Sequence, residues 1–135
     1  MTAPADLAAL VRRGTREFNR GRFMEAHEHW EAMWREAPAE VRPLLEALVQ
    51  LATALHLRSA RGGVRGAEHL LSQALVTLDD YRPSAQGIDV ARLIEDADAF
   101  LAALRAARRP YVESDRAGLP RIRAAGGWRG WLGRG

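Results

Sequence analysis

The 135-residue chain contains no cysteine. This absence excludes disulfide bonds, thiolate zinc sites and a cysteine nucleophile. No uninterrupted apolar run approaches the roughly 18 residues of a membrane-spanning helix, and the N-terminal sequence lacks the basic start and apolar stretch of an export signal. We therefore expect a cytoplasmic protein without a membrane partner, and the length suits a single domain.

Lysine is absent as well, so all 20 basic side chains are Arg, and 25 residues are Ala. A bias of composition explains this pattern as well as a selected use of Arg for bidentate contacts does. The chain also has no phosphate-binding glycine motif, no serine nucleophile elbow and no dinucleotide fingerprint. The common sequence signatures of an enzyme are therefore missing.

The positive charge is concentrated at the C-terminal end. Residues 1–104 hold 12 Arg against 15 Asp and Glu, whereas residues 105–135 hold 8 Arg against 2 acidic residues. Arg interleaved with Tyr111, Trp128 and Trp131 can contact phosphates and stack on bases. A flexible end of biased composition accounts for the same residues. Because the rest of the chain is slightly acidic, nucleic acid is not the partner that we expect.

Helical periodicity dominates the chain up to Arg109, and no alternating strand pattern competes with it. Asp6 is the expected N-cap of the first helix. We predict an all-α fold, a compact five-helix domain over residues 1–109, followed by an irregular, basic, Gly/Arg/Trp-containing tail over residues 110–135. The predicted helices cover about residues 6–19, 22–36, 39–60, 64–81 and 89–108.

The sequence also repeats itself weakly at an offset of 41 residues. Each copy consists of a helix, a Gly turn and a second helix that an apolar residue begins. Small residues let two antiparallel helices approach closely, so we predict two antiparallel, tetratricopeptide-like hairpins and a closing fifth helix. The first copy contains Gly21, Phe23, Ala26, Trp30 and Trp34, and the second contains Gly62, Val64, Ala67, Leu71 and Leu75.

The densest group of polar side chains lies in the second predicted helix. His27 lies about 60° and Glu31 about 100° from the centre of its apolar stripe, and the two are neighbours because they are four residues apart. Glu28 lies about 160° away, toward solvent. His27 and Glu31 therefore lie at the border between core and water.

A slowly drifting polar seam of Gln50, Thr53 and His56 interrupts the apolar third helix, and we expect part of it to face His27 and Glu31. His27, Glu31 and His56 would then be ligands of a divalent metal, with water completing the site. In such a site Glu28 would act as the base, although its direction argues against that role. Buried hydrogen bonds without metal explain the same residues.

Two further groups allow a structural and a functional interpretation. Trp30 and Trp34 both fall on the apolar stripe, where we expect packing rather than ligand stacking. Arg58, Arg61 and Arg65 surround the Gly turn before the fourth helix, whose amide groups would suit an anion. Solvated arginines at a turn are the alternative interpretation.

Two segments, FNRGRFMEAHEHWEAMW and LVQLATALHLRSARGGVRGAEHLL, carry a family resemblance. Over about residues 15–80 the chain resembles the bacterial and archaeal family catalogued as domain of unknown function 309. The resemblance implies an all-helical fold and no particular activity, because the family has none established. The chain departs from the family pattern at Glu46-Ala47 and Gly62-Gly63. The matching positions are Phe18, Gly21, Phe23, His27, Glu28, Glu31, Trp34, Gln50, His56, Gly66 and Ala67.

The sequence therefore leaves two main hypotheses about function, beside a weaker third one, nucleic-acid binding through the tail. The first is a non-catalytic binding or scaffold protein, with another protein as its partner, and it rests on the hairpins and on the missing catalytic motifs. The second is a metal-dependent hydrolase that uses His27, Glu31 and His56. Self-association is compatible with exposed hairpin edges, although no residue requires it.

Overall fold

The computed structural model describes residues 4–126, and it is mostly helical, as the sequence predicts. A two-stranded antiparallel sheet and a short 3-10 helix, η1, were not predicted. The elements are α1 (Pro4–Asn19), α2 (Phe23–Trp34), α3 (Arg42–Arg61), α4 (Arg65–Asp79), β1 (Ser84–Ala85), β2 (Ile88–Asp89), α5 (Val90–Ala106) and η1 (Glu113–Gly118).

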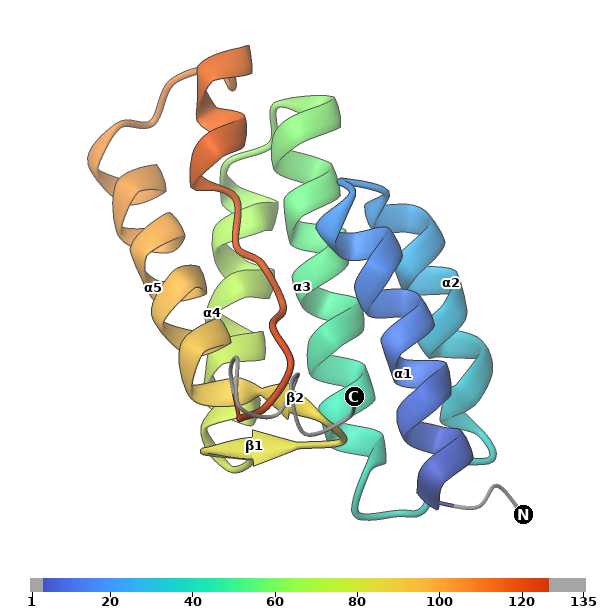
Figure 1. Ribbon diagram of the computed structural model, residues 1–135. Helices are drawn as coiled ribbons and strands as arrows, with labels where there is room; N and C mark the ends of the chain where they lie inside the picture. The colour runs from blue at the N-terminus through green and yellow to red at the C-terminus, as the bar shows by residue number, and fades with distance from the viewer. Residues whose placement is uncertain (1–3, 127–135) are drawn as a thin grey trace.

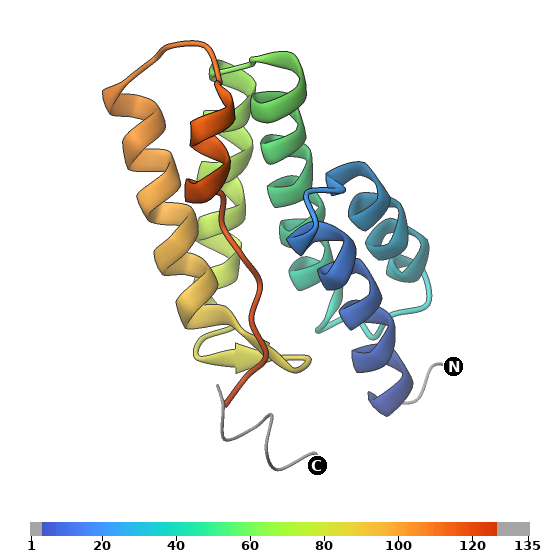
Figure 2. The same ribbon diagram turned by 45° about the horizontal axis from the view of Figure 1, so that its top comes forward.

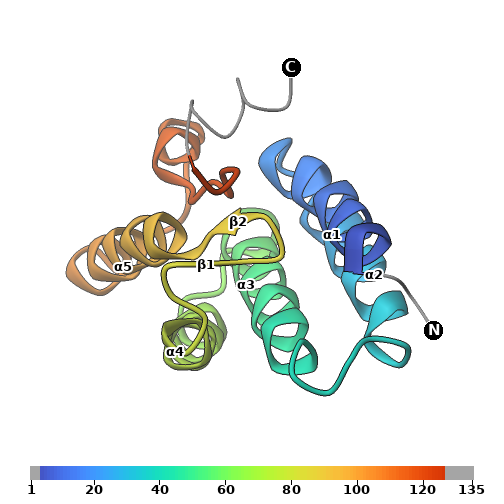
Figure 3. The same cartoon turned by 60° about the horizontal axis from the view of Figure 1, so that its bottom comes forward.

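The five α-helices form a single row in which each helix packs on the next one in the chain (Figure 1). α3 lies in the middle of the row, with α2 on one side and α4 on the other. α1 and α2 form one end of the row and α5 the other, which is clearest in Figure 3. The outer side of the α1–α2 pair is therefore not covered by another described helix.

The turns between the helices follow from a few local signals. Gly21 and Gly62 adopt left-handed backbone angles, with φ of 80° and 72°, which glycine adopts without strain. Asp89 caps α5 by accepting a hydrogen bond from the backbone N–H of Arg92. The N-cap predicted at Asp6 is wrong, because α1 already begins at Pro4 and Asp6 lies in its first turn.

The contact between α1 and α2 is built around one tryptophan. Trp30 is fully buried, and its indole N–H donates to the backbone oxygen of Val11 at 3.2 Å. Phe18 packs against it with ring centroids 6.0 Å apart. Gly14 leaves room for the indole, since a Cβ at this position would lie 2.3 Å from Nε1 of Trp30. The packing predicted for Trp30 is confirmed.

The C-terminal segment is not irregular throughout, contrary to the prediction. After η1, the chain runs back between α1 and α5, over α3 (Figure 2). The backbone N–H of Ile122 donates to Oδ1 of Asn19 and its carbonyl accepts from Nδ2, both at 2.8 Å. Ala124 pairs with Ile88 in an antiparallel bridge, and the Arg123 side chain donates to Asp96. Ile122 is buried in the core, so the segment completes the helical body.

Candidate functional site

The structure places His27 and Glu31 side by side on α2. Nε2 of His27 lies 3.1 Å from Oε2 of Glu31, as their spacing of four residues predicts. The Glu31 side chain is 68% exposed, whereas the Nδ1 atom of His27 is buried and has no hydrogen-bond partner among the described residues. The pair therefore combines a solvated carboxylate with a half-buried imidazole, of which only one ring nitrogen has a polar partner.

The polar seam of α3 does not act as one surface. Residues three apart in an α-helix are rotated by about 60° from the starting direction, so Gln50 and His56 differ by about 120°. Gln50 turns to α4, where its Nε2 donates to Oε1 of Gln73 at 3.3 Å. Thr53 donates to the backbone oxygen of Val49 in its own helix. Gln50 therefore contacts α4, and the expectation that another part of the seam faces His27 and Glu31 stays a prediction.

The ligand set predicted for a divalent metal is not assembled in residues 4–126. No group of three or more His, Asp or Glu side chains in this part of the chain is arranged to hold a metal ion. His27 and Glu31 are together, but His56 does not join them in such a group. Glu28, the predicted base, is exposed on α2. The metal-dependent hydrolase therefore stays a hypothesis.

Trp34 does not belong to the core stripe with Trp30. It is 38% exposed, and the guanidinium of Arg42 lies over its ring at 5.1 Å from the centroid. Arg42 also donates to the backbone oxygens of Ala37 and Arg35. Trp34 and Arg42 therefore hold the turn between α2 and α3, and the packing role predicted for Trp34 in the core is corrected to this role.

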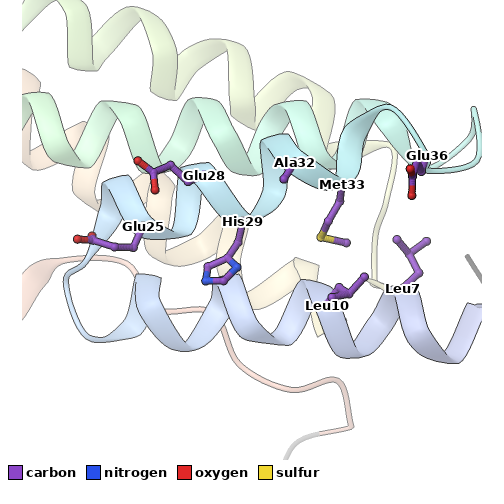
Figure 4. A pocket seen from close by; sticks show the side chains of 8 residues that line it. All are labelled: Leu7, Leu10, Glu25, Glu28, His29, Ala32, Met33 and Glu36. Atoms are coloured by element: carbon purple, nitrogen blue, oxygen red, sulfur yellow. The ribbon is translucent and has the colours of Figure 1, made fainter.

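A groove of about 440 Å³ runs along the uncovered side of α1 and α2. Its apolar part consists of Leu7 and Leu10 from α1 and of Met33 from α2. Figure 4 shows the Met33 and His29 side chains directed from α2 toward α1, with Leu7 and Leu10 directed toward α2. The remaining lining residues are Glu25, Glu28, Ala32 and Glu36.

The rim of this groove is acidic. Glu25, Glu28 and Glu36 are exposed, and none of them forms an ion pair with another described residue. Glu25 and Glu28 lie three residues apart on one side of α2, and Glu36 lies two residues beyond the end of this helix. Of these three carboxylates the sequence singles out only Glu28, as a side chain directed toward solvent and as a possible base. The groove combines three carboxylates with an apolar floor.

The comparison with known families adds one result to this geometry. The model of the family described as Domain of unknown function (DUF309) matches residues 11–70. The match covers 60 of the 135 residues. The matched segment contains α2, α3 and most of α1, together with every position on which the resemblance was based. Comparison with curated proteins and with solved structures gives no significant match, so the tetratricopeptide likeness stays a prediction.

Two other expectations concern the surface of the protein. Within residues 4–126 every helix is too short or too polar for a membrane crossing. The aromatic residues Trp128 and Trp131 lie outside the described residues, as do Arg129 and Arg134. Of the basic side chains in the C-terminal segment, Arg109 and Arg123 are paired with Asp115 and Asp96, which leaves them less available to a phosphate backbone.

Proposed function

We propose that this chain is a non-catalytic binding module whose α1–α2 groove takes a basic segment of a partner protein. The observation that carries the proposal is the combination of three exposed carboxylates, Glu25, Glu28 and Glu36, with an apolar floor. A segment that alternates Arg or Lys with large apolar residues would place its apolar side chains on the floor. Its cationic side chains would then lie beside the carboxylates on the rim.

Three features support a partner protein rather than a small substrate. The groove is elongated along two helices and lies at the open end of the helical row. Its charged side chains surround the floor rather than converge on one point, as they would around a reacting group. One face of the helical row, between α1 and α5, is already covered by the chain's own C-terminal segment, whereas the groove at the α1–α2 end is open.

The test measures binding of a labelled amphipathic peptide of Leu and Arg to the full chain by fluorescence anisotropy. We expect the joint replacement Glu25→Gln, Glu28→Gln and Glu36→Gln to weaken binding at least about tenfold, equivalent to about 1.4 kcal/mol. The binding of the unchanged protein should also weaken with added salt. A charge-reversed peptide of Leu and Glu should not bind.

The matched control changes three exposed carboxylates outside the groove, Glu40, Glu46 and Glu95, to Gln. Both triple variants have the same net charge, so equal weakening in both would show attraction to overall charge and would reject the groove. Peptide binding that requires prior replacement of Trp128 and Trp131 would show that the chain fills its own groove. A concentration-dependent dimer lost with the three groove carboxylates would identify a second copy as occupant. Either result would reject a partner protein.

A further inference from the structure

Arg58 is the only charged side chain that is buried among the described residues, with 4% of its surface exposed. It lies near the end of α3, and none of the ion pairs among the described residues includes it. Its Nη1 atom is buried without a hydrogen-bond partner. Burying a charged group without a partner costs free energy, so this guanidinium requires an explanation.

The Arg58 guanidinium borders a second cavity, of about 310 Å³, between α3, α5 and the segment around η1. Its Cζ atom lies 5.8 Å from the centroid of the Tyr111 ring, which lines the same cavity. The α5 wall is apolar, with Phe100 and Leu104 as its large side chains. This volume lies at the small end of the range of ligand sites, roughly 300–1,000 Å³.

The chain's own carboxylate in this cavity is already committed to another arginine. Asp115 accepts two hydrogen bonds from Arg109, at 2.6 and 2.8 Å, and one from the backbone N–H of Val112. These contacts, chiefly the hydrogen bonds from Arg109, hold the pKa of Asp115 well below its usual range, with a smaller contribution from the charge of Arg58. Asp115 and Arg109 therefore neutralise each other, and the charge of Arg58 remains in surplus.

The tyrosine beside Arg58 does not supply the missing charge. Burial raises the pKa of Tyr111, and the neighbouring carboxylates of Glu113 and Asp115 raise it further. The phenol therefore stays neutral near pH 7. The face of its ring attracts the guanidinium as a cation–π partner, but it leaves Nη1 of Arg58 without a hydrogen-bond acceptor.

From these contacts we propose that the cavity binds a small organic monocarboxylate, with Arg58 as the partner of its carboxylate group. The planar guanidinium matches a carboxylate through two parallel hydrogen bonds. Phe100, Leu104 and the Tyr111 ring would surround the apolar body of the ligand. A single surplus positive charge suits a monoanion, whereas a phosphate group near neutral pH carries between one and two negative charges and needs more donors.

The test uses the full chain and three probes: benzoate, its uncharged analogue benzamide, and inorganic phosphate. Calorimetry and thermal unfolding measure binding, since a ligand that binds the folded state raises the melting temperature in a concentration-dependent way. We expect benzoate to bind, and benzamide to bind at least about tenfold more weakly or not at all. Absence of benzoate binding would overturn the proposal, and phosphate binding in its place would assign the site to phosphate instead.

Two pairs of variants locate the binding. Arg58→Met keeps an unbranched stem in the core and removes an unpaired charge, so we expect it to fold and to lose benzoate binding at least about tenfold. Its control is Arg61→Met. Arg61 lies about one turn later on α3, is exposed and does not line the cavity. Equal benzoate affinity in Arg58→Met and the unchanged protein would overturn the proposal.

The second pair blocks the cavity without touching the arginine. Ala103 is exposed on α5 and lines the cavity, so Ala103→Leu adds bulk at the opening and leaves the core unchanged. Ala102→Leu is the matched control, because Ala102 is also exposed on α5 but does not line the cavity. We expect benzoate binding to weaken in Ala103→Leu alone. Equal affinity in the two variants would place the ligand elsewhere and reject this cavity.

Discussion

Gly14 determines how closely α1 and α2 approach each other. In Gly14→Ala the new Cβ would lie 2.3 Å from Nε1 of Trp30, whose N–H donates to Val11. Alanine favours the helix by about 1 kcal/mol over glycine, but overpacking and an unpaired indole N–H cost about 1–3 kcal/mol each. We expect the free energy of unfolding, measured by urea denaturation, to fall by about 2 kcal/mol or more.

The control for this substitution is Gly118→Ala at the end of η1. A Cβ added there meets no atom within 4 Å, so we expect a change within about 0.5 kcal/mol. If Gly14→Ala were as stable as the unchanged protein, α1 and α2 would have to lie further apart than the structure places them. The clash at Trp30 is therefore what the measurement tests.

For single residues, the sequence predicts contacts within one helix better than contacts between helices. The His27–Glu31 pair follows from a spacing of four residues on α2 alone. Whether His56 joins that pair depends on the rotation of α3 about its axis, which no local spacing determines. Trp34 fits the apolar periodicity equally well, yet α2 ends at this residue and its ring turns to Arg42 instead of the core.

The position of the C-terminal segment depends on a single side chain of α1. Asn19 at the end of α1 makes two hydrogen bonds to the backbone of Ile122, each contributing about 0.5–1.5 kcal/mol. In Asn19→Asp the side chain can still accept from the N–H of Ile122. A carboxylate oxygen replaces the donating Nδ2, however, and it faces the carbonyl oxygen of Ile122 without a hydrogen bond. We expect faster tryptic cleavage after Arg121 and Arg123, by about tenfold, because the segment opens more often.

Thr15→Val serves as the control for Asn19→Asp. Thr15 lies one turn earlier on α1, and its hydroxyl donates only to Val11 within the same helix. We expect its cleavage rate after the two arginines to equal that of the unchanged protein. Equal rates in Asn19→Asp as well would show that the other contacts of the segment, such as those of Asp96, hold it without the asparagine.

The element boundaries show what short-range signals can and cannot predict. Glycine and proline between helices, together with the helical period, predict the number and order of the five α-helices. Strands β1 and β2 have two residues each, which is too short for an alternating pattern to be recognised. The course of residues 119–126 depends on partners about a hundred positions away, such as Asn19, and no sequence period indicates such a contact.

For the whole molecule, the question is whether the chain unfolds as one unit or as a helical domain with a separate tail. The sequence predicts a boundary at residues 109 and 110. Ile122 lies beyond this boundary, but it is 3% exposed and belongs to the same core as the buried residues of the helices. The buried position of Ile122 favours a single cooperative unit.

Ile122→Ala tests this cooperativity. Truncating a buried isoleucine costs about 2–5 kcal/mol, and in a single cooperative unit this loss appears in the unfolding of the helices themselves. We expect the urea midpoint of the helical circular dichroism signal to fall accordingly. Val112→Ala, at a position that is 48% exposed, should change stability by less than about 0.5 kcal/mol. An unchanged midpoint in Ile122→Ala would mean that residues 1–109 fold independently of the segment that covers them.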